Sequence, residues 1–286
     1  MIRKRKAHQK NHSVLPKLAG VVLILVLTVV IVFWPKYWNG KSKLAVVINR
    51  GEEGAMVSLF DPKQDEITNL FITGQTQVLA AGGFGPWKIK SLWQLGINEK
   101  IGGALLARTI AKNFGFPVAV WADGLGLGYQ KTNLTLGDRA RLSLFSLRVK
   151  KSDIEDIRLE ETGMLKKSRF IDGEDGFLPT GEISAKIAAI FVSNQTTDQS
   201  LKAKIIDGSE KKNASPMVGK IIEVMGLKVA AIVQEGERIE GCFVSGNNPR
   251  LIEEIALIFG CKAEKKTLEG SFDVEIKIGE DFVNRF

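Results

Sequence analysis

Histidine and cysteine are scarce in this sequence of 286 residues, and their positions exclude several kinds of chemistry. The two histidines, His8 and His12, precede residues 13–286, which can therefore form neither a Ser–His–Asp nor a Cys–His arrangement. The two cysteines, Cys242 and Cys261, lack the C-x-x-C spacing of a zinc site, so we expect no metal site. An oxidising compartment would permit a disulfide between them, but two buried thiols are the simpler expectation.

Acidic residues are absent from the first 43 positions, which contain nine lysines and arginines. The whole chain has a formal net charge of +8, so residues 44–286 carry −1 once these nine charges are removed. A pI of about 9.4 would otherwise suggest a polyanionic partner. Because the excess charge belongs to the N-terminal segment, we expect no nucleic-acid partner.

Charged residues are also missing between positions 18 and 34. Counted from Val14, the apolar segment would form a helix of 21 residues, about 31 Å long, which matches the thickness of a bilayer core. The run is longer than that of a signal peptide, and no small-residue cleavage site follows it, so we predict a retained transmembrane helix at 18–34. Trp34, Tyr37 and Trp38 are placed for an aromatic belt at the far interface.

The distribution of lysine and arginine predicts the orientation of this helix. Six of them precede the apolar run and three follow it closely, which places a basic tail, residues 1–17, in the cytoplasm. We expect residues 35–286 to lie outside the cell, beginning with a short polar linker at residues 35–43. We therefore expect a single-pass protein of the cell membrane with a signal-anchor helix and extracytoplasmic C-terminal domains.

Strand and helix patterns alternate in the exported part, which indicates the mixed α/β class. Short apolar, β-branched runs predict three strands, at residues 44–48, 55–60 and 67–72. Helical spacing over residues 103–114 predicts a helix that Gly115 closes. Residues 130–200 are harder to assign, because two segments fit a strand or a helix, namely 142–149 and 184–193.

Residues 203–286 predict a small two-layer βαββαβ domain. Its two helices each begin with a polar residue followed by proline, Ser215-Pro216 and Asn248-Pro249, and each ends at a glycine. At residues 272–278, apolar and charged residues alternate as in a half-exposed strand.

Three segments of this region resemble the C-terminal domain of LytR-type envelope proteins. They read KAKIIDGSEKKNASPMVGKIIEVMGLKV, FVSGNNPRLIEEIALIFG and FDVEIKIGEDF, and they cover about residues 203–286. Two further segments, VSLFDPKQDEITNLFITGQTQV and GGALLARTIAKNFGFPVAVWADG, more faintly resemble the LytR–CpsA–Psr domain. The resemblance implies that residues 44–200 form a degenerate domain of that family.

The LytR–CpsA–Psr family transfers lipid-carried glycopolymers to peptidoglycan with the help of arginines, aspartates and Mg²⁺. Here Thr73, Gly74 and Gln75 stand where the family has Pro-Arg-Asp, and only Arg50 remains of the arginines after the first strand. Because arginines hold a diphosphate by bidentate contacts, no catalytic residue is carried over. We expect a noncatalytic envelope protein without a cofactor that binds wall polymer or envelope partners. The alternative is an active phosphotransferase that uses Mg²⁺ and attaches lipid-linked glycopolymer to peptidoglycan.

Five basic residues are candidates for ligand binding. They follow the first predicted strand or lie in the segments GGFGPWKIK and DRARL, and they are Arg50, Lys88, Lys90, Arg139 and Arg141. Lysines beside a glycine-rich turn could bind a polyanion, although a tight turn with solvated lysines is the plainer explanation. The arginines could meet phosphate, although a charged exposed face explains them more simply. Glu52 and Glu53, which follow Arg50, could hold a metal ion if the alternative function applies.

Overall fold

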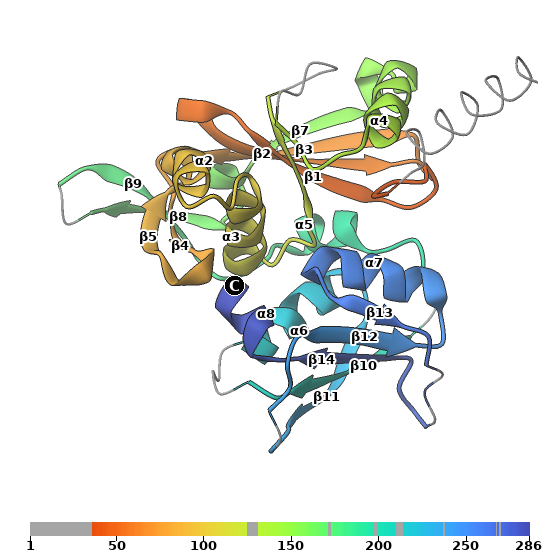
Figure 1. Cartoon of the computed structure of the whole chain (residues 1–286). Helices are drawn as coiled ribbons and strands as arrows, with labels where there is room; N and C mark the ends of the chain where they lie inside the picture. Colours follow the sequence, from red (N-terminus) through yellow and green to blue (C-terminus); the bar gives the residue numbers. More distant parts are fainter. Residues whose placement is uncertain are drawn as a thin grey trace, which may run out of the picture.

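The computed structural model describes residues 36–124, 131–170, 173–196, 200–209, 214–236, 238–266, 268 and 270–286. The predicted basic tail and transmembrane helix, residues 1–34, lie outside the described residues. Among the residues that are described, no helix combines the length and the apolar character needed to cross a membrane. The described chain forms a mixed α/β structure around two five-stranded sheets (Figure 1).

The first sheet has the strand order β6-β1-β2-β3-β7. Its strands are β1 (Leu44–Asn49), β2 (Gly54–Asp61), β3 (Glu66–Thr73), β6 (Val120–Asp123) and β7 (Ile154–Arg158). The first three strands form an antiparallel meander, whereas β6 runs parallel to β1 and β7 runs parallel to β3. The carboxyl ends of β1, β3, β6 and β7 therefore share one edge of the sheet. The three strands predicted for this region are confirmed to within one residue at each end.

Helices cover both faces of this sheet, which explains why β1 and β2 are buried along almost their whole length. On one face lie α2 (Ile89–Asn98) and α3 (Ala104–Phe114). On the other face, α4 (Leu136–Arg148) packs through Leu142 and Phe145. The predicted end of α3 is confirmed, because Gly115 adopts the left-handed conformation with a φ of 73°.

Both segments that fitted a strand or a helix are helical. Residues 142–148 belong to α4, and residues 184–193 contain α5 (Ala185–Phe191). Two hairpins extend the first part of the molecule, β4 (Gln77–Ala80) with β5 (Gly85–Lys88) and β8 (Leu165–Arg169) with β9 (Asp175–Pro179). Single-turn 3₁₀ helices are η1 (Gly51–Glu53), η2 (Ala81–Gly83), η3 (Lys151–Asp153) and η4 (Leu159–Glu161).

The C-terminal region forms the second sheet, with the strand order β11-β10-β14-β12-β13. Its elements are β10 (Lys202–Asp207), α6 (Ala214–Val224), β11 (Lys228–Gln234), β12 (Cys242–Gly246), α7 (Pro249–Phe259), β13 (Lys262–Glu264), β14 (Val274–Ile278) and α8 (Glu280–Arg285). Apolar residues of α6 and α7 pack on one face of this sheet. On the other face, Lys204 and Lys277 pair with Glu275. The region is therefore two-layered, as predicted.

The predicted βαββαβ order of this region is wrong by two elements. A short strand, β13, follows α7 and pairs in parallel with β12, and a final helix, α8, follows β14. β14 then lies in the middle of the sheet, parallel to β10 and antiparallel to β12. The three residues of β13 are all exposed, so they lack the apolar alternation by which a strand is identified in a sequence.

The expectation of two buried thiols is also wrong, because Cys242 and Cys261 form a disulfide. The bond joins the start of β12 to the chain just after α7, across 19 residues of sequence. The disulfide therefore ties the C-terminal end of α7 to the sheet.

Residues 36–43, predicted as a polar linker, are bound to the body of the protein. The carboxylate of Asp138, in the first turn of α4, accepts hydrogen bonds from the backbone N–H groups of Lys36, Tyr37 and Trp38 at 3.1 to 3.3 Å. The Trp38 ring is 2% exposed and meets Phe145 edge-on, with ring centroids 5.5 Å apart. Trp38 therefore belongs to the core, and its assignment to a membrane aromatic belt is wrong.

Candidate functional site

The carboxyl ends of β1 and β6 bring two polar side chains into contact at one edge of the first sheet. Asn49 Nδ2 donates a hydrogen bond to Asp123 Oδ1 at 2.9 Å, and Asn49 Oδ1 accepts one from Gly51 N at 3.2 Å. Asp123 was not among the candidates from the sequence. Its position as the last residue of an apolar strand is the signal that could have identified it.

Two of the five candidate cations, Arg50 and Lys90, meet at this edge around η1. Arg50 Nε donates to Glu53 Oε2 at 2.9 Å, and its guanidinium lies 5.4 Å from the ring centroid of Phe71. Lys90 Nζ donates to Glu52 Oε2 at 2.9 Å. Two carboxylates therefore neutralise the two cations, and the four side chains together present no excess positive charge to an anionic ligand.

The other three candidates lie elsewhere. Lys88, at the end of β5, pairs with Glu174 and lies 5.4 Å from the ring centroid of Phe170. Arg139 and Arg141 belong to α4, on the face of the sheet opposite α2. The structure therefore does not gather the five candidates into one site.

Gly74 occupies the position where the resemblance would put an arginine. Its backbone N–H donates to the carbonyl oxygen of Glu53 at 2.9 Å, which holds the end of β3 against η1. A Cβ atom at this position would lie 2.3 Å from the carbonyl oxygen of Glu52, closer than any real contact. Glycine is required there, and this backbone has no room for a longer side chain. Next to it, Gln75 Oε1 and Thr76 Oγ1 are buried and have no hydrogen-bond partner among the described residues.

A metal site was not expected, and the carboxylates of η1 are the groups that the alternative function would require. Glu52 and Glu53 each hold a cation instead. Among the described residues, no group of three or more His, Cys, Asp or Glu side chains is arranged to hold a metal ion.

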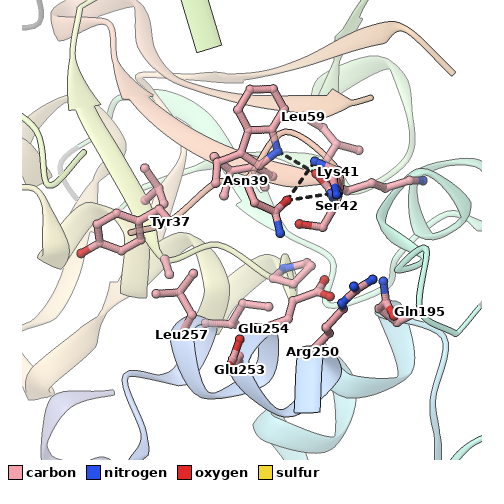
Figure 2. A pocket seen from close by; sticks show the side chains of 18 of the residues that line it. Tyr37, Asn39, Lys41, Ser42, Leu59, Gln195, Arg250, Glu253, Glu254 and Leu257 are labelled. Carbon is pink, nitrogen blue, oxygen red and sulfur yellow. Dashed lines mark hydrogen bonds between the residues drawn. The ribbon is translucent and has the colours of Figure 1, made fainter. Parts of the chain in front are cut away.

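A cavity of about 280 Å³ lies between the two parts of the molecule (Figure 2). One wall is the segment from Lys36 to Ala45, and the opposite wall is α7, which supplies Arg250, Glu253, Glu254 and Leu257. Domain interfaces are common places for ligand sites, and this cavity joins the segment next to the predicted membrane helix to the C-terminal region. None of its residues was predicted from the sequence.

A buried ion pair lies beside this cavity. Lys43 Nζ is 3.2 Å from Asp61 Oδ2 and donates a hydrogen bond to the carbonyl oxygen of Ile190 at 2.8 Å. Burial raises the pKa of the Glu254 carboxyl to about 7, although the hydrogen bond from Ser193 Oγ, at 2.9 Å, and the charge of Lys43 both lower it. Four segments far apart in the sequence, the linker, β2, α5 and α7, therefore meet around one lysine.

The cavity has a mixed charge. Its basic residues are Lys36, Lys41, Lys43 and Arg250, and its acidic residues are Glu253 and Glu254. Because Asp61 neutralises Lys43 and Glu254 is half protonated near neutral pH, the remaining groups favour an anionic ligand. Among its described lining residues the cavity offers no nucleophile paired with a base, so its groups suit binding better than catalysis.

No known family pattern matches the chain, and no curated protein matches it. One of the solved structures that match is Bacillus subtilis TagT, with 12% identity and a TM-score of 0.34 over 52% of this chain and 89% of that one. A structure of TagT bound to LIIa-WTA has 14% identity and a TM-score of 0.38 over 52% and 89%. The Lin1025 protein of Listeria innocua has 11% identity and a TM-score of 0.37 over 49% and 93%. At these values the likeness supports no inference about fold or function.

Proposed function

We propose that this protein is a membrane-anchored, extracytoplasmic component of the cell envelope that binds wall polymer or envelope partners and does not catalyse glycopolymer transfer. The proposal rests on the resemblance to LytR-type and LytR–CpsA–Psr proteins and on the uncharged segment at residues 18–34. The disulfide between Cys242 and Cys261 supports an oxidising compartment outside the cytoplasm.

The observation that supports a noncatalytic role is the pairing of cations with carboxylates at the edge of the first sheet where β1 and β6 end. Diphosphate transfer develops negative charge that fixed cations or a carboxylate-held metal must stabilise. At this edge Arg50 is bound by Glu53 and Lys90 by Glu52, and Gly74 has no room for an arginine. The cations and carboxylates at this edge are therefore paired with each other, which leaves no excess positive charge for a diphosphate.

The test combines two measurements on the full-length chain in detergent micelles. The first is a transfer assay with lipid-diphosphate glycan, a peptidoglycan oligomer and Mg²⁺. The second measures retention of the same preparation on purified cell walls. The proposal predicts retention on the walls without transfer. Transfer that disappears in the double variant Glu52→Gln, Glu53→Gln would overturn it in favour of the active phosphotransferase. The matched control, Glu235→Gln with Glu264→Gln, removes two exposed carboxylates of the C-terminal region instead.

A further inference from the structure

α4 carries three large apolar side chains on its outer surface. Leu136, Leu144 and Leu147 are 55%, 67% and 81% exposed. With Ala140 they occupy positions i, i+4, i+8 and i+11, which fall on one stripe of a helix of 3.6 residues per turn. Contiguous apolar patches on the surface of a soluble protein often mark an interaction site.

This stripe is separate from the one that α4 buries. Leu142 and Phe145 face the first sheet and pack in its core, with exposed fractions of 3% and 6%. The outer leucines therefore contribute nothing to the packing of α4 against the sheet. In Figure 1, α4 lies on the side of the first sheet that faces away from α6 and the second sheet, so the C-terminal region does not cover it.

Basic side chains flank the outer stripe. By helical geometry, Arg141 and Arg148 lie along one side of it and Arg139 along the other. Arg148 also pairs with Asp65 and stacks on Phe145. The sole acidic residue of α4, Asp138, is fully buried and engaged with the backbone of residues 36–38. An apolar stripe bordered by arginines is the pattern of a helix that lies in the interface of an anionic membrane.

The position of α4 along the chain identifies the surface that it meets. Asp138 fixes its first turn to Lys36 through a hydrogen bond of 3.1 Å, and Lys36 follows the predicted membrane-spanning segment by two residues. The start of α4 therefore lies next to the point where the chain would leave the bilayer.

We propose that α4 lies flat on the outer surface of the membrane in which the chain is anchored, with Leu144 and Leu147 among the lipid head groups and arginines against lipid phosphates. This inference rests on the anchor in the proposed function, but it concerns a different surface and a different partner. The partner is an anionic lipid bilayer, and a second protein on the same leucines is the competing outcome.

The test uses the full-length chain in vesicles of phosphatidylglycerol and phosphatidylcholine. An environment-sensitive fluorophore is attached to cysteine in the variants Leu144→Cys and Leu147→Cys, since the native cysteines are joined and do not react. The control is Ile232→Cys, a side chain 51% exposed on β11. Nitroxide-labelled lipid and aqueous iodide serve as two quenchers.

We expect lipid nitroxide to quench the labels at 144 and 147, iodide to reach them poorly, and both effects to be reversed at 232. The double variant Arg139→Gln, Arg141→Gln should weaken the lipid quenching in vesicles that contain phosphatidylglycerol and leave it unchanged in phosphatidylcholine alone. Labels that iodide reaches as easily as the control overturn the inference. Labels shielded from iodide but not quenched by lipid also overturn it and indicate a protein on this face.

A separate experiment tests whether the chain is anchored in the membrane. An alkaline wash of vesicles that carry the unlabelled chain, followed by flotation, removes a peripheral protein and retains an inserted one. Loss of the chain in this wash contradicts the proposed function, whereas retention with water-exposed labels contradicts only the role of α4.

Discussion

At the scale of single residues, Asp138 makes several contacts that could not be predicted from the sequence. Its carboxylate forms a capping box with Thr135 and also accepts from the backbone of Lys36, Tyr37 and Trp38. The capping role follows from the spacing of T-x-x-D before an apolar run, and that part could be read from the sequence. The contacts with residues a hundred positions earlier could not, because nothing in the local pattern specifies them.

Replacing Asp138 with alanine should lower the free energy of unfolding by about 3 kcal/mol, since a cap and several charge-assisted hydrogen bonds are lost together. Chemical denaturation measures this loss. Trypsin should also cleave faster after Lys36 and Lys41 in the variant, because the segment is released. Asp175→Ala, at an exposed position, should leave both properties unchanged.

The raised pKa of Glu254 predicts how stability depends on pH. The folded protein retains a proton on this carboxyl that the unfolded chain releases near pH 4.5, so stability is fully present below that pH and falls until the folded pKa of about 7 is passed. Relative to wild type, Glu254→Gln should therefore gain up to about 3 kcal/mol between pH 4.5 and pH 8. The comparison is made by denaturation at both pH values. Glu253→Gln, next to it and exposed, should follow the wild-type curve.

At the scale of elements, the sequence predicted a helix correctly where the helix has a single apolar face that packs in a single core. The caps of α7 are an example, because Asn248 accepts from the N–H groups of Arg250 and Leu251 and Gly260 closes the helix as predicted. α4 was ambiguous for the opposite reason. Its outward Leu144 and Leu147 add to the inward apolar residues, so the segment alternates like a strand while it is helical.

The apolar face of α6 gives a direct test of the second core. Ile221 is fully buried in it, so Ile221→Ala should lower the free energy of unfolding by about 2–5 kcal/mol through lost burial and a residual cavity. Thermal or urea unfolding monitored by circular dichroism measures the change. Ile232→Ala removes the same atoms from an exposed position of β11, and a loss of similar size there would contradict the assignment of the core.

At the scale of the whole molecule, the two sheets share one apolar cluster. Phe116, before β6, stacks on Phe191 of α5 with ring centroids 4.8 Å apart, and α5 packs on α6. The C-terminus returns to the first part, where Lys112 Nζ donates to the carbonyl oxygen of Phe286 at 2.5 Å. None of these contacts is encoded by a local pattern, so the sequence predicted three strands of the first sheet and the two layers of the C-terminal region, but not the interface or the cavity in it.

A shared core predicts that the described part of the chain unfolds in one transition. All five tryptophans lie before residue 122, so their fluorescence does not report on the C-terminal region, whereas circular dichroism reports on both sheets. The two signals should give the same denaturation midpoint. Midpoints that separate clearly would mean that the two parts unfold independently and that the shared cluster adds little stability.

The bound state of residues 36–43 determines how far the protein can reach. A free stretch of nine residues, 35–43, would let the body move up to about 30 Å from the end of a membrane helix. With Lys36, Tyr37 and Trp38 held by Asp138, that slack is absent, so in the proposed membrane-anchored arrangement the body would stay at a fixed height above the bilayer. A protein anchored in this way would not search the depth of the wall, and a wall-polymer ligand would have to arrive at the membrane surface.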